Sequence, residues 1–91
     1  MTNFEDEAKK IAEIVSTKQL AYGDSFKKTQ QILLILYPEG IPVAAYNDAL
    51  ALIRVLDKIV RIATANGQKD MLEENPWSDI MGYSLLSVCK E

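Results

Sequence analysis

Two carboxylates and two cations carry the chemistry that this chain could perform. Asp57, Lys58 and Arg61 lie within five residues of one apolar stretch, and Asp79 begins the next. Mg²⁺ prefers oxygen ligands and bridges them to phosphate oxygens. Arg offers phosphate a two-pronged donor, and Lys offers a point charge. The set predicts Asp57 and Asp79 as metal ligands for Mg²⁺, with Lys58 and Arg61 binding phosphate.

The same charges have a purely structural interpretation. Asp57 can pair with Arg54 three residues before it and with Arg61 four residues after it, as charges on one helix face commonly do. Asp79 can simply stabilise a helix N-terminus. On the other hand, Arg54, Lys58 and Arg61 form a strip of like charges, which is unfavourable unless acids or an anion lie between them. Both interpretations stay open.

The residue inventory excludes several kinds of catalysis. The chain has no His and a single Cys, Cys89, so neither a Ser-His nor a Cys-His nucleophile can form. A zinc site of Cys and His is excluded for the same reason, and no glycine-rich stretch has the spacing of a phosphate-binding loop. An enzyme with this composition would therefore depend on carboxylates and a metal ion.

The spacing of apolar residues predicts a single all-α domain, residues 1–91, that folds as a small four-helix bundle-like structure. The expected helices span roughly residues 3–20 and 26–37, a long central helix 42–64 that starts at Pro42 or at Tyr46, and a final helix 76–90. The central helix is apolar around most of its circumference, so we expect neighbours on several sides of it.

The breaks between helices have recognisable signals. Gly23 permits the positive φ that ends a helix, and Asp24 with Ser25 can cap the next one. Alternatively, Tyr22, Asp24 and Ser25 can present hydrogen-bonding groups to a ligand from this loop. Asn75 is a favourable N-cap for the final helix.

Charge and hydrophobicity limit the partners. A net charge of −3 gives no basic surface for duplex nucleic acid. With 48% hydrophobic residues, we expect some apolar surface to be buried in a homo-oligomer. No apolar run reaches the ~18 residues of a membrane span, the N-terminus is acidic, and one Cys suits a reducing compartment. A cytoplasmic protein with no membrane association is expected.

Three stretches carry a resemblance to a known family. They are residues 18–25 (Lys-Gln-Leu-Ala-Tyr-Gly-Asp-Ser), 56–62 (Leu-Asp-Lys-Ile-Val-Arg-Ile) and 75–83 (Asn-Pro-Trp-Ser-Asp-Ile-Met-Gly-Tyr). Together they resemble the phage and prophage family called the nucleotide modification associated domain, a distant relative of the MazG-like all-α nucleotide pyrophosphohydrolases. That family has a Tyr-Gly-x-Ser loop, an Asp-Lys-x-x-Arg helix and a last helix that pairs an acid with Gly-Tyr.

The resemblance implies a phage-type helical protein that binds a nucleotide or another phosphorylated small molecule. The matching residues are Tyr22, Gly23, Asp24 and Ser25 in the loop, Asp57, Lys58 and Arg61 in the central helix, and Asp79 and Tyr83 in the last. MazG-like enzymes also share a Glu-x-x-Glu and a Glu-x-x-Asp pair. Here positions 54 and 60 carry no acid, and Pro76 stands three residues before Asp79. The carboxylate pairs are incomplete, which leaves catalysis open.

Three functions are therefore compatible with the sequence. The first is a nucleotide-binding protein, with Mg²⁺-dependent pyrophosphohydrolysis as its enzymatic form. The second is a non-catalytic binder that sequesters a nucleotide or signalling molecule or inhibits a host protein. The third is a structural helical oligomer in which the charged strip is an ion-pair network.

Overall fold

The protein, described by a computed structural model over residues 3–70 and 72–89, is all-helical in this range. The helices are α1 (Phe4–Tyr22), α2 (Ser25–Leu36), the short 3₁₀ helix η1 (Val43–Ala45), α3 (Tyr46–Ala65) and α4 (Pro76–Val88). The prediction of an all-α chain with four helices is confirmed. Residue 90, the predicted end of the final helix, lies outside the described residues. None of the described helices has the length and apolar character needed to cross a membrane.

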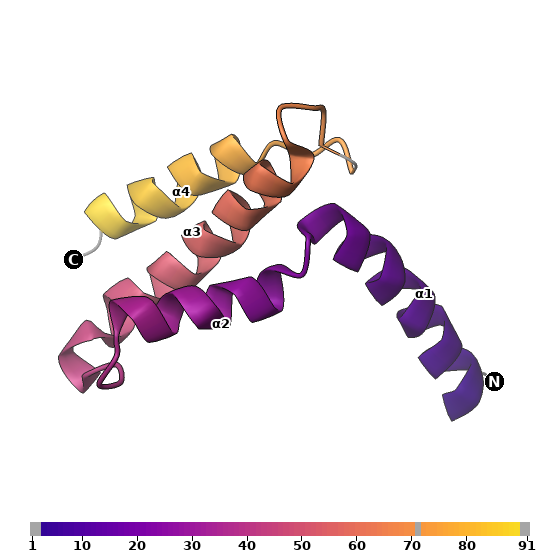
Figure 1. Ribbon diagram of the computed structural model, residues 1–91, viewed down its shortest axis with the longest axis horizontal. Coiled ribbons are helices and arrows are strands. Elements are labelled where there is room, and N and C mark those ends of the chain that lie inside the picture. Colours follow the sequence, from indigo (N-terminus) through magenta and orange to yellow (C-terminus); the bar gives the residue numbers. More distant parts are fainter. Residues whose placement is uncertain (1–2, 71, 90–91) are drawn as a thin grey trace.

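Helix α3 lies at the centre, as its apolar circumference predicts. Helices α2 and α4 pack along it, whereas α1 meets it only near the end of α1 and then projects away from the other helices (Figure 1). Of the two predicted starts of the central helix, Pro42 and Tyr46, the structure has the second, because α3 begins at Tyr46. Pro42 has an extended backbone, and the three residues after it form the 3₁₀ turn.

Local signals set most helix ends. The Asn3 side chain accepts a hydrogen bond from the backbone N–H of Asp6 at 2.8 Å, which caps α1. The Asn75 side chain accepts one from the backbone N–H of Ser78 at 3.3 Å, and Pro76 follows in the first turn of α4. Asn66 adopts a left-handed conformation at the end of α3. These ends follow from well-known capping preferences.

Asp24 departs from its predicted capping role. It stands at the N-cap position of α2, but its φ is 57° and its side chain caps no backbone N–H of that helix. Its carboxylate instead accepts a hydrogen bond from Nε2 of Gln19 at 2.9 Å. The left-handed backbone turns the carboxylate back toward α1, so the prediction that Asp24 caps α2 is wrong.

The core of the described chain is thin. Five apolar side chains are buried, Ala21, Ala49, Leu56, Val60 and Pro76, and three of them belong to α3. The radius of gyration is 16.0 Å, whereas a compact domain of this length has a value near ~12 Å. Many large apolar side chains on all four helices therefore remain in contact with solvent.

Gly23 makes the turn from α1 to α2 possible and yields the first prediction. Its φ is +60°, and a Cβ built on it would collide with the side chain of Thr64 on α3. We expect Gly23→Ala to lower the free energy of unfolding by about 1–3 kcal/mol, through backbone strain plus the collision. Chemical denaturation measures this.

Two matched variants separate these causes. Gly67 has a φ of +81° with no atom near the added Cβ, so Gly67→Ala reports strain alone. Gly82 lies within α4 with free space around it, so Gly82→Ala should be neutral or stabilising. Equal losses for Gly23→Ala and Gly67→Ala would refute the proposed collision with Thr64.

Candidate functional site

Arg61 is the most deeply buried charged side chain among the described residues, with 2% of its surface exposed. Its Nε and Nη2 atoms donate to the two carboxylate oxygens of Asp70, each at 2.8 Å. Its Nη1 atom donates to Oε2 of Glu74 at 3.0 Å. The guanidinium also lies over the ring of Tyr22, 4.5 Å from the ring centre. A buried charge is tolerated only when it is paired and hydrogen-bonded, and Arg61 is both.

Asp70 is held as firmly as the arginine that it binds. Its Oδ2 atom also accepts the backbone N–H groups of Leu72 at 2.9 Å and Glu74 at 3.1 Å. The hydrogen bond from Arg61 is the main cause that lowers the pKa of the Asp70 carboxyl, against the opposing effect of burial. Burial alone would lower the pKa of Arg61, but its bonds to Asp70 and Glu74 outweigh this and raise it.

A second ion pair joins α3 to the start of α4. The Lys58 ammonium lies 3.5 Å from Oδ2 of Asp79, and the Lys58 side chain is only 16% exposed. One turn further along α4, the ring of Tyr83 receives the guanidinium of Arg54 at 5.6 Å. The cations of the predicted phosphate strip therefore each have a separate contact. The acids Asp70 and Glu74, rather than Asp57, neutralise Arg61.

The predicted site residues thus do not come together in one place. Tyr22 and Arg61 touch each other, and Lys58 and Asp79 form a pair. Ser25 is buried at the start of α2, while the Asp24 carboxylate binds Gln19. Asp57 stands apart from all of these, because it makes no hydrogen bond or ion pair with any described residue. The helix-surface pairs of Asp57 with Arg54 and Arg61 do not form.

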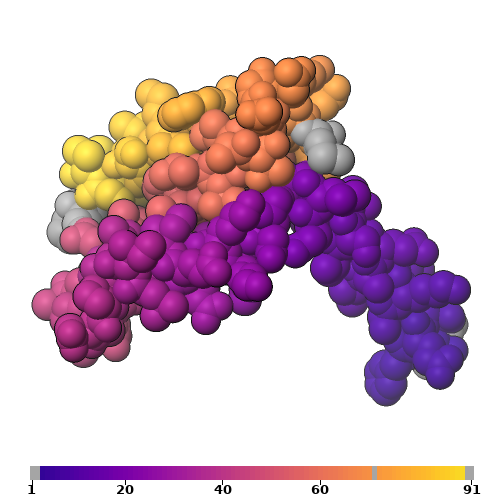
Figure 2. Space-filling view, viewed as in Figure 1, coloured from indigo at the N-terminus to yellow at the C-terminus, as the bar shows by residue number. Residues whose placement is uncertain are grey.

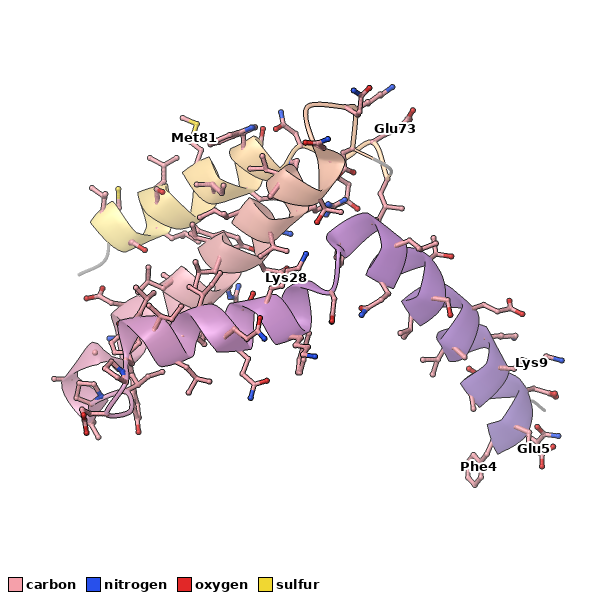
Figure 3. All side chains as sticks on the ribbon, in the orientation of Figure 1. Phe4, Glu5, Lys9, Lys28, Glu73 and Met81 are labelled. Carbon is pink, nitrogen blue, oxygen red and sulfur yellow. The ribbon has the colours of Figure 1, made fainter. Side chains whose placement is uncertain are left out.

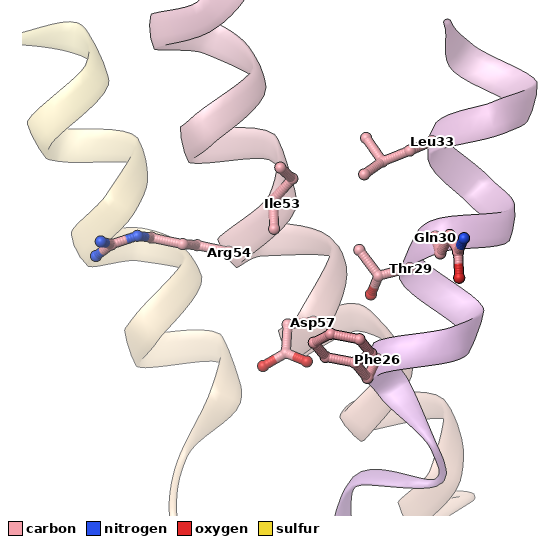
Figure 4. Close-up of a pocket in the computed structure, with 7 residues that line it drawn as sticks. All are labelled: Phe26, Thr29, Gln30, Leu33, Ile53, Arg54 and Asp57. Atoms are coloured by element: carbon pink, nitrogen blue, oxygen red, sulfur yellow. The ribbon is translucent and has the colours of Figure 1, made fainter. Parts of the chain in front are cut away.

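Asp57 instead lines an open pocket of about 590 Å³ between α2 and α3. The other lining residues are Phe26, Thr29, Gln30 and Leu33 from α2, with Ile53 and Arg54 from α3. Figure 4 shows the Asp57 carboxylate beside the Phe26 ring, with the Thr29 side chain facing α3 and Arg54 directed toward α4.

Thr29 gives this pocket its chemical character. The residue is 7% exposed, and its hydroxyl finds no hydrogen-bond partner among the described residues. A buried polar group without a partner costs about 1–3 kcal/mol, so such groups are rare in folded proteins. A hydroxyl can donate and accept, and an ionised carboxylate accepts. Thr29 and Asp57 together offer a ligand one donor and several acceptors.

Sequence reasoning missed Thr29, Asp70 and Glu74. Thr29 reads as one polar residue of a helix, and nothing local shows that its hydroxyl is buried and unpaired. Asp70 lies nine residues after Arg61, across the turn that ends α3, so no helical spacing relates them. The only available signal was the group of acids that directly follows the central helix.

The predicted Mg²⁺ site depends on which carboxylates lie close together. Residues 3–70 and 72–89 contain no group of three or more His, Cys, Asp or Glu side chains placed to hold a metal ion. Of the two predicted ligands, Asp79 is engaged by Lys58, and Asp57 faces the pocket. The described residues therefore do not form a ready multi-carboxylate site, and the Mg²⁺ assignment stays a prediction.

Comparisons with protein families, with curated proteins and with solved structures found no match. The resemblance to the nucleotide modification associated domain consequently rests on the three motifs alone.

The Arg61 cluster gives the second prediction. Asp70→Asn removes the charge that neutralises a buried arginine, so we expect the free energy of unfolding at pH 7 to fall by about 2–4 kcal/mol. Glu73→Gln is the matched control, because Glu73 is an exposed carboxylate of the same loop. A variant as stable as the control would contradict this role of Asp70.

The stability of the protein at acidic pH tests the same pair, Arg61 and Asp70. The pKa of Asp70 is lower in the folded protein than in the unfolded chain. Its stabilising effect is therefore complete above the unfolded value, about 3.9, and is lost as the pH falls through the folded value. We expect the stability difference between wild type and Asp70→Asn to shrink below about pH 4. A stability difference between the two proteins that stays constant from pH 7 to pH 2 would contradict the proposed role of the Asp70 carboxylate.

Proposed function

We propose that the protein binds a nucleotide in the pocket between α2 and α3. The observation that carries this proposal is the buried, unpartnered Thr29 hydroxyl in the pocket that the unpaired Asp57 carboxylate also lines. A few polar groups beside apolar walls are the usual composition of a small-molecule site, and here these are the buried Thr29 hydroxyl and the partly exposed Asp57 carboxylate. A bound ligand would supply the hydrogen bonds that the described residues do not.

The size and lining of the pocket suit a nucleoside with its phosphates. A volume of about 590 Å³ lies within the ~300–1,000 Å³ of ordinary ligand sites. The Phe26 ring, 88% exposed, offers a face on which a base can stack. Leu33 and Ile53 form an apolar wall, and Asp57 can accept a hydrogen bond from a base amino group or a sugar hydroxyl.

Arg54 is the cation nearest this site that no described carboxylate engages. It lines the pocket and makes no salt bridge with a described residue, but its guanidinium lies over the Tyr83 ring and would have to turn from that ring toward α2 to reach a phosphate. Lys58 and Arg61, the phosphate-binding residues expected from the sequence, are each engaged by carboxylates. A phosphate on them would have to displace Asp79, Asp70 or Glu74. The proposal therefore shifts the phosphate contact from Lys58 and Arg61 to Arg54.

Mg²⁺ enters the proposal as a cation carried by the nucleotide, with Asp57, the carboxylate among the described residues that line the pocket, as its protein ligand. The phage-type assignment and pyrophosphohydrolase activity rest on the resemblance alone. The geometry favours holding a nucleotide over hydrolysing it, because Asp79 is committed to Lys58. Sequestration of a nucleotide or signalling molecule is thus the form of the function that the site supports best.

A ligand panel tests the proposal. Nucleosides and nucleoside mono-, di- and triphosphates are added with and without Mg²⁺, and the melting temperature is followed against ligand concentration. We expect a concentration-dependent rise with at least one nucleotide. Phosphate and pyrophosphate release in the same samples distinguishes turnover from holding. A panel without any shift would refute the proposal.

Thr29→Val gives the third prediction, in which stability and binding change in opposite directions. Val keeps the shape of Thr and removes the unpaired hydroxyl, so the ligand-free protein should be as stable as wild type or more stable, by about 0–2 kcal/mol. The affinity for the nucleotide found in the panel should fall about 10-fold, since one ligand hydrogen bond is lost.

Calorimetric titration measures this affinity, and Thr17→Val is the matched control on the exposed face of α1. Asp57→Asn should weaken binding while leaving the unfolding free energy within about 0.5 kcal/mol, because no described residue pairs with Asp57. A Thr29→Val protein that loses stability yet binds as wild type would mean that the hydroxyl serves the fold.

A further inference from the structure

Helix α1 carries an apolar stripe that the rest of the chain leaves uncovered. Phe4, Ala8, Ile11 and Val15 follow each other at spacings of four, three and four residues. Phe4, Ile11 and Val15 are 94%, 57% and 55% exposed. This spacing is the 3.5-residue repeat of a coiled-coil seam, which is normally buried against another helix.

Helix α1 also projects away from the other helices, so its apolar side chains find few neighbours within the chain. Only its last residues pack on α3, and the remainder projects into solvent at an open angle to α2 (Figure 2). Figure 3 shows Phe4 at the free end of this helix, with Lys9 on a different side. Most helices in proteins owe their stability to packing of their apolar face, so contact with another surface is expected to stabilise α1.

The accessible surface gives the size of the missing contact. The chain exposes 7331 Å², whereas a compact monomer of 10.2 kDa exposes about 5,300 Å². The excess is about 2,000 Å² per chain, or about 4,000 Å² for two chains, and obligate homodimers bury about 2,000–5,000 Å² in total. This excess belongs to the whole chain, the stripe of α1 included, and it falls within the range that stable homodimers bury.

We propose that α1 is the dimerisation helix and that its occupant is α1 of a second copy, packed antiparallel about a two-fold axis. In this register Phe4 lies opposite the partner's Val15 and Ala8 lies opposite the partner's Ile11. Large side chains then meet smaller ones, as interdigitated packing requires.

The charges of α1 select the antiparallel orientation. The first turn holds three acids, Glu5, Asp6 and Glu7. Parallel α1 helices would place six carboxylates side by side and align both helix dipoles. They would also bring the α2–α4 parts of both chains to the same end of the pair. Antiparallel helices separate the acidic turns and place the bodies at opposite ends of the pair.

The fourth prediction concerns the oligomeric state. It is measured by light scattering after size exclusion over a range of concentrations. The wild type should have the mass of two chains. Ile11→Lys and Val15→Lys, which place a charge on the stripe, should each reduce it to the mass of one chain. Thr17→Lys adds the same charge on the far side of α1 and should remain a dimer.

Cysteine cross-linking in a Cys89→Ser background tests the orientation with small side chains that preserve the fold. The double variant Ala8→Cys with Ile11→Cys should oxidise to a covalent dimer. Phe4→Cys alone should not, because the two copies of position 4 would be about 16 Å apart along the helix pair. A wild type that stays monomeric, a Thr17→Lys protein as monomeric as Ile11→Lys, or a cross-linked Phe4→Cys dimer would each overturn the proposal.

Discussion

The ion-paired guanidinium of Arg61 is the interaction on which the arrangement of the helices depends. It joins three segments distant in sequence: the end of α1 through Tyr22, the centre of the fold through α3, and the loop after α3 through Asp70 and Glu74. Glu74 directly precedes the Asn75 cap of α4. The Arg61 side chain, which binds Glu74, therefore also holds the start of the last helix. In a chain with five buried apolar side chains in its described part, a polar cluster replaces part of a hydrophobic core.

The ion pairs of α3 also determine which of its charged side chains remain able to bind a ligand. Because Asp70 and Glu74 neutralise Arg61, and Asp79 neutralises Lys58, the charges along that side of α3 satisfy one another. Asp57 belongs to the same helix but faces α2, where the Thr29 hydroxyl is also unpaired. Asp57, the carboxylate proposed to bind a ligand, thus lies apart from the ion pairs that Lys58 and Arg61 form on the same helix.

The sequence predicted what local chemistry determines. Helix number, the Asn75 cap and the left-handed Gly23 follow from residue type and spacing. Contacts across loops do not follow a helical period, so the pairing of Arg61 with Asp70 could not be predicted. The same limit applies to Thr29, whose missing hydrogen bond is a property of its three-dimensional surroundings. Asp24 shows a third limit, since its unusual backbone conformation overrides its capping preference.

One measurement tests the central claim most directly: the amide spectrum of ¹⁵N-labelled protein during addition of the nucleotide that raises the melting temperature. The account predicts that the largest shifts belong to Thr29, Gln30, Ile53 and Asp57, on the two helices that line the pocket. Amides of residues 68–70 and 72–74, around the Arg61 cluster, should change little. Shifts concentrated in that loop, or no shifts at all, would contradict it.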